Sequence, residues 1–65
     1  ERDRLRDAIA RLDPMYREPL ALQVLLGLSI AEIAAELELS ESAVMTRVFR
    51  AREQLKARLA DENRP

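Results

Sequence analysis

The chain has 65 residues and a formal net charge of -1, and its length fits one small domain or a fragment of a larger protein. It has no cysteine and no histidine, which excludes disulfides, thiolate or imidazole metal sites and a histidine general base. Because so short a chain builds only a small core, we expect no enzyme cleft and no cofactor. The absence of an initial methionine predicts a piece of a longer protein. No apolar run is long enough to span a bilayer, so we expect no membrane insertion.

Two helices are predicted in the first half of the chain. The first covers residues 2–12, where apolar side chains recur at helical spacing, and Asp13-Pro14 ends it. The same pair opens the second helix with Asp13 as N-cap, and Gly27 is expected to end it in a left-handed conformation. Pro19 leaves two alternatives: the second helix is bent at this residue, or it starts near Glu18.

Two further helices are predicted in the second half. Ser29 and Glu32 have the spacing of a capping box, which opens a helix with an apolar stripe up to Leu37. After a three-residue link, Ser40 is expected to cap a last helix over residues 41–60, followed by a polar tail over 61–65. A short helix, a tight turn and a long helix have the spacing of a helix-turn-helix, although an ordinary helical hairpin shares it. The predicted fold class is all-α: one four-helix domain over residues 1–60, with a helix-turn-helix and no wing.

The charges are distributed unevenly along the chain. Residues 1–39 sum to -3, whereas residues 40–60 carry five basic and two acidic side chains and sum to +3. A local basic segment matters more for binding a polyanion than the total charge does. The last helix is therefore the part of the chain expected to meet a nucleic acid.

The last helix is predicted to have one buried and one exposed side. At about 100° per residue its apolar stripe falls within about 60°, at Val44, Val48, Ala51 and Leu55. Phe49 points away from this stripe, beside Thr46 and Arg50. Because arginine pairs with guanine and a phenyl ring packs on a thymine methyl, this side suits base contact in a major groove. The expected base or groove contacts are Ser42, Met45, Thr46, Phe49 and Arg50. The alternative is that Phe49 packs on the first helix or on a missing domain and the arginines form a solvated face.

The stretch from Leu12 to Leu55 resembles region 4 of the sigma-70-type transcription initiation factors, and most closely the extracytoplasmic-function group. The matching segments and residues are Tyr16-Arg17-Glu18, Gly27-Leu28-Ser29, Glu32-Ile33-Ala34, Leu39-Ser40, Val44, Arg47 and Phe49-Arg50-Ala51-Arg52. They occur in the family's order and cover about two thirds of the chain.

The resemblance implies a cytoplasmic protein that docks on the flap of the RNA polymerase beta subunit and reads the promoter element near position -35. It also implies an anti-sigma factor as a partner. Thr46, Phe49 and Arg50 would face the groove of the promoter DNA. The expected phosphate contacts are Ser40, Arg47, Arg52 and Lys56, with Arg47 and Arg52 as structural partners in the alternative.

Four residues depart from the family pattern. Met45 stands where a basic residue is common, and Gln23 stands where an arginine of the second helix often contacts DNA. Glu38 replaces the usual turn glycine and would have to adopt a left-handed backbone there. Pro19 replaces a branched apolar residue.

Two other functions stay open at the level of sequence. One is a protein-interaction module, such as a sigma-like decoy or an anti-sigma-factor-binding domain that does not read DNA. The acidic first 39 residues and their apolar helix faces suit a helical partner, and Met45 and Gln23 favour a decoy, whereas the intact segment 49–52 favours DNA binding. The other is a LuxR-type response-regulator effector domain, which shares Glu-Ile-Ala but usually has a histidine where Arg47 stands.

Overall fold

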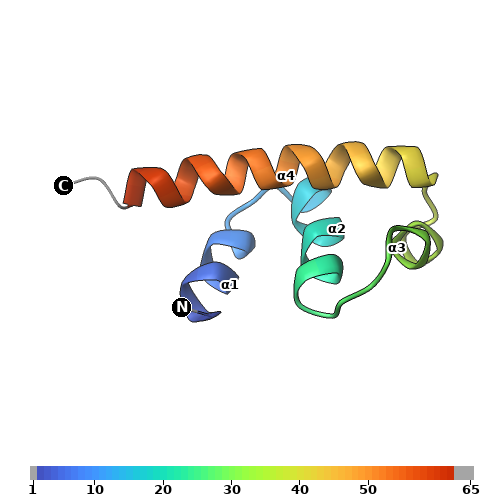
Figure 1. The fold of residues 1–65 in the computed structure, drawn as a ribbon, viewed down its shortest axis with the longest axis horizontal. Coiled ribbons are helices and arrows are strands. Elements are labelled where there is room, and N and C mark those ends of the chain that lie inside the picture. The colour runs from blue at the N-terminus through green and yellow to red at the C-terminus, as the bar shows by residue number, and fades with distance from the viewer. Residues whose placement is uncertain (1, 63–65) are drawn as a thin grey trace.

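The computed structural model describes residues 2–62. Within this range there are four α-helices and no strand: α1 (Arg2–Ala10), α2 (Pro14–Val24), α3 (Ile30–Leu37) and α4 (Glu41–Glu62). α4 is the longest, and the other three helices lie along one side of it and contact it (Figure 1). The predicted all-α class with four helices is confirmed.

Side-chain caps fix where three of the helices begin. At the start of α2, Oδ1 of Asp13 accepts a hydrogen bond from the backbone N–H two residues further on, at 3.2 Å. At the start of α3, Oγ of Ser29 accepts from the N–H of Glu32 at 3.1 Å, and Oε1 of Glu32 accepts from the N–H of Ser29 at 2.8 Å. Ser40 caps α4, since its Oγ accepts from the N–H three residues on at 3.0 Å. These bonds satisfy donors that a first helical turn leaves unpaired, and they confirm the predicted caps and capping box.

The first two helices end earlier than the sequence predicts. α1 stops at Ala10, and the next two N–H groups bond carbonyls three residues back at 3.3 and 3.0 Å, which tightens the chain into a turn before Pro14. α2 stops at Val24 instead of Gly27, because the chain leaves the helix through a turn at residues 25–26. Gly27 does have the predicted left-handed backbone, with φ 70°, but in the loop beyond the helix.

Pro19 lies inside α2 and does not mark its start. The helix runs without interruption from Pro14, so the alternative start near Glu18 is wrong. A proline has no N–H to donate to the carbonyl four residues back, which costs α2 one hydrogen bond. Its ring is fully buried in the core, and this packing offsets part of that cost.

The core is built around α4. The four predicted stripe residues of α4 are all buried, from 0% exposed at Val44 and Ala51 to 9% at Leu55, so the predicted rotation of this helix is confirmed. They pack with buried side chains from the rest of the chain: Ala8, Ile9, Leu12, Leu20, Ile33 and Ala34. α4 also continues to Glu62, past the predicted end at residue 60, so the first two residues of the predicted tail are helical. The rest of that tail, residues 63–65, lies outside the described part of the chain.

Candidate nucleic-acid interface

α3, the turn over residues 38–40 and α4 form a helix-turn-helix. Glu38 adopts the left-handed conformation expected of it, with φ 57° and ψ 46°. The N–H of Glu38 bonds the carbonyl of Ala35 at 3.4 Å, and the N–H of Leu39 bonds the carbonyl of Ala34 at 2.9 Å. This pair of bonds is a Schellman motif, which ends α3 sharply, and Leu39 then packs against the core. The turn thereby sets the direction in which α4 leaves α3.

The first half of α4 exposes the predicted groove contacts. Phe49 is 64% exposed and Met45 is 59% exposed, although both are large and apolar. Ser42, Thr46 and Arg50 are exposed as well. The alternative in which Phe49 packs on the first helix is wrong, because its ring lies on the surface opposite the buried stripe, whereas packing on a further domain is not tested.

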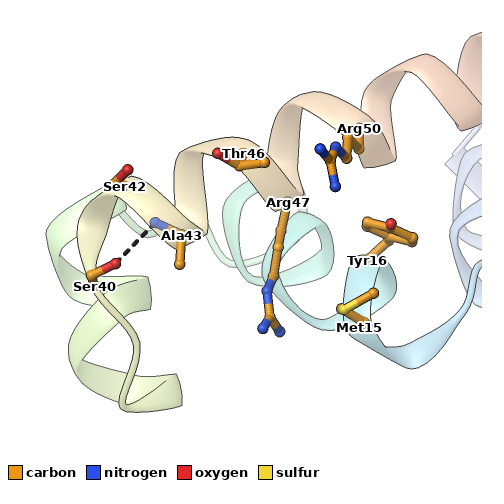
Figure 2. A pocket seen from close by; sticks show the side chains of 8 residues that line it. All are labelled: Met15, Tyr16, Ser40, Ser42, Ala43, Thr46, Arg47 and Arg50. Atoms are coloured by element: carbon orange, nitrogen blue, oxygen red, sulfur yellow. Dashed lines mark hydrogen bonds between the residues drawn. The ribbon is translucent and has the colours of Figure 1, made fainter.

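An open hollow of about 410 Å³ lies between the start of α2 and the first half of α4 (Figure 2). Five predicted site residues come together here: Ser40, Ser42, Thr46, Arg47 and Arg50. α2 contributes two residues that the sequence did not single out as site residues, Met15 and Tyr16. In Figure 2 the side chains of Arg47 and Arg50 lie on the side of α4 that faces these two residues.

A second group of predicted site residues lies along α4. Phe49, Arg52 and Lys56 line another hollow, of about 370 Å³, on the surface of α4. Nη2 of Arg52 donates a hydrogen bond to Oε1 of Gln23 in α2 at 2.6 Å. Lys56 Nζ lies 3.8 Å from a carboxylate oxygen of Glu53 on the same helix. The structure therefore places eight of the nine predicted contacts on two neighbouring surfaces of α4, and Met45 lines neither hollow.

The electrostatics of these surfaces favour an anionic ligand. Within the described residues no carboxylate pairs with Arg47 or Arg50, so no neighbouring group offsets the positive charge of either. The residues described also contain no group of three histidine, cysteine, aspartate or glutamate side chains that could hold a metal ion. No helix in residues 2–62 combines the length and apolar character needed to cross a membrane. What these surfaces offer is arginine, hydroxyl and aromatic side chains on one helix.

A helix-turn-helix whose second helix carries such side chains outward defines a DNA-binding domain of the helix-turn-helix class. The family model described as sigma-70, region 4 matches residues 2–55, and the chain belongs to this family. It is a family of DNA-binding domains of sigma factors with a role in promoter recognition, and not a family of enzymes. No curated protein matches the chain. The resemblance to region 4 is thus confirmed, and assignment to the extracytoplasmic-function group stays a prediction.

Proposed function

We propose that this chain reads the promoter element near position -35 as region 4 of an alternative sigma factor of the extracytoplasmic-function group. The observation that carries the proposal is the exposed first half of α4, where Thr46, Phe49 and Arg50 lie opposite the core. An α-helix fits the major groove with such residues against the base edges. Arg50 would pair with guanine, Phe49 would pack on a thymine methyl, and Thr46 would bond a base edge or a phosphate. Ser42 and Met45 would border the same contact.

Phosphate contacts on both sides of this face would hold α4 in register. Arg47 supplies a charge from the hollow that α4 shares with Tyr16. Ser40 uses an oxygen lone pair to cap α4 and still has its O–H to donate to a phosphate. Arg52 and Lys56 would act from the neighbouring surface. Contacts of this kind position the protein without carrying sequence information.

Docking on the RNA polymerase beta flap would use another part of the domain. Three successive apolar residues at the end of α2 are exposed, Val24 at 36%, Leu25 at 42% and Leu26 at 68%. Val24 and Leu25 line a small hollow with Leu5 and Arg6 of α1. Residues 24–26 line neither of the two hollows that hold the predicted DNA contacts, so polymerase and DNA would use different surfaces. Exposed apolar side chains of this kind are typical of protein contacts.

The test is a selection of the 65-residue chain on a pool of randomised duplexes, followed by fluorescence anisotropy with the enriched duplex and its shuffled counterpart over a salt series. We expect a preference for the enriched duplex and a log–log salt slope of about -3 to -4, from three to five phosphate contacts. Binding without preference between the two duplexes would contradict a reading function.

The second candidate is a protein-interaction module that binds an anti-sigma factor and does not read DNA. Two observations favour it: Met45 is exposed yet uncharged on the DNA-facing side, and the apolar group at residues 24–26 is uncovered. A domain of this kind would bind an anti-sigma factor or the polymerase flap while failing to bind any duplex at low salt. Either role places the protein in the cytoplasm, where transcription takes place.

A further inference from the structure

Within residues 2–62, one side-chain hydrogen bond connects α2 to α4. Nη2 of Arg52 donates to Oε1 of Gln23 at 2.6 Å, across 29 positions of sequence. Gln23 lies in the last turn of α2 and is half-buried, whereas Arg52 is exposed. Gln23 is therefore the fixed partner, and the hydrogen bond determines where the exposed side chain of Arg52 points.

The acceptor in this bond is neutral. An amide oxygen orients a guanidinium without cancelling its charge, whereas a carboxylate would do both. Lys56, in the same surface hollow, provides the contrast, because its ammonium group lies 3.8 Å from the Glu53 carboxylate. Of the two cations in this hollow, Arg52 is held in place and keeps its full charge. The guanidinium also has four further N–H donors for an anion.

Arg52 is placed beside a groove-facing residue. It lines the same hollow as Phe49, which is 64% exposed on the DNA-facing side of α4. We propose that Gln23 is a positioning residue that holds Arg52 ready to bind a DNA phosphate next to Phe49. This inference rests on the proposed DNA-reading function. A side chain fixed in advance loses less conformational freedom on binding, so the tether raises affinity without touching the DNA itself.

The test compares three variants by anisotropy over a salt series, with the enriched duplex and its shuffled counterpart. Arg52→Gln removes one phosphate contact, so the log–log slope should become less negative by about 0.9 for both duplexes. Gln23→Glu should give the same change, because its carboxylate pairs with Arg52 and cancels the charge while keeping the bridge. Gln23→Leu removes the acceptor but leaves the charge, so the slope should hold while Kd rises by about 2- to 12-fold, as expected for one side chain that is no longer held in place. Thermal unfolding of each variant separates a lost fold from a lost contact.

The matched control is Gln54→Glu at the only other glutamine, which is exposed and two residues, about 200°, around α4 from Arg52. It makes the same charge change without reaching Arg52, so its slope should stay near that of the wild type. Equal effects of the two glutamate variants would reduce the result to total charge and overturn the proposal. So would a Gln23→Leu effect of the same size in an Arg52→Gln background, because Gln23 would then not act through Arg52. Failure of the wild-type chain to bind either duplex would instead overturn the proposed function itself.

Discussion

Arg50 is the residue on which base discrimination should depend most. It is exposed, lies in the hollow between α2 and α4, and has no carboxylate partner among the described residues. Arg50→Ala should cost about 1–3 kcal/mol of binding free energy and relax the preference for one base pair. The measurement is binding to a set of duplexes that differ at single positions.

Lys56→Ala is the control for this prediction. It removes the same charge further along α4, so it should weaken binding to all sequences alike. The loss should stay below that of a full phosphate contact, because Glu53 already offsets part of the Lys56 charge. Unchanged base discrimination in Arg50→Ala would show that Arg50 is not a base contact. A base-specific effect in Lys56→Ala would contradict the role of Lys56 as a phosphate contact.

Glu38 is the one described residue other than glycine with a positive φ. A left-handed backbone costs an L-residue about 1–2 kcal/mol, and glycine avoids this cost but adds flexibility to the unfolded chain. Glu38→Gly should therefore raise the free energy of unfolding by about 1 kcal/mol, which corresponds to a rise in Tm of about 4–8 °C. Glu36→Gly makes the same change inside α3 and should lower Tm, since glycine weakens a helix by roughly 0.5–1 kcal/mol. A fall in Tm for Glu38→Gly would mean that its side chain stabilises the turn.

At the scale of the element, the capping box makes α3 sensitive to acid. The N–H of Ser29, followed by its hydroxyl, lowers the pKa of Glu32 from its ordinary value of 4.5. Because the folded pKa lies below the unfolded one, ionised Glu32 stabilises the fold fully above about pH 4.5. This contribution is lost as the pH falls through the lower, folded pKa. Urea unfolding of the wild type and Glu32→Gln should differ at pH 7 and converge toward pH 3.

Glu36→Gln removes an equal charge from α3 without touching the capping box and serves as the matched control. A difference between wild type and Glu32→Gln that stays constant from pH 7 to pH 3 would rule out the ionised cap. In that case the hydrogen bond to Ser29 would act without its charge, as it does in a neutral capping box.

The starts of the capped helices and the rotation of α4 depend on neighbouring residues in sequence and could be predicted, whereas features that depend on how helices cross could not. The caps at Asp13, Ser29 and Ser40 and the buried stripe of α4 follow from local spacing, and all are confirmed. The continuity of α2 through Pro19 depends on how well its ring packs, which no local pattern shows.

In the candidate site, the exposed residues of α4 could be predicted, whereas their contacts with α2 could not. Periodicity along α4 predicted that Met45, Phe49 and Arg50 would be exposed. It gave no sign that Tyr16 shares a hollow with Arg47 and Arg50, or that Gln23 bonds Arg52, because both depend on where α2 crosses α4. Both residues carried a signal in the sequence: Tyr16 is the only tyrosine of the chain and part of a family motif, and Gln23 stands where the family often has a DNA-contacting arginine.

At the scale of the whole molecule, α4 carries both the core and the site. Its buried side contacts α1, α2 and α3, and the opposite side of its first half carries the expected DNA contacts. The net charge follows the same division: residues 40–60, most of α4, sum to +3, whereas residues 1–39 sum to -3. In the proposed function, a molecule polarised in this way would meet DNA with α4 first, because the summed field would orient it before contact. Stability and recognition therefore depend on a single rotational setting of α4.

That setting can be tested through Val48, which is 5% exposed on the buried side of α4, one turn before Ala51 and Arg52. Val48→Ala should lower the free energy of unfolding by about 0.5–1.5 kcal/mol or more, because the removed methyl groups leave a void that the core fills only in part. The measurement is thermal unfolding, with Val24→Ala as the matched control: Val24 is 36% exposed, so the same truncation should change Tm much less. Equal effects at the two positions would mean that α4 is rotated about its axis. Thr46 and Arg50 would then no longer lie opposite the core, and the reading face would have to be sought among other residues of the helix.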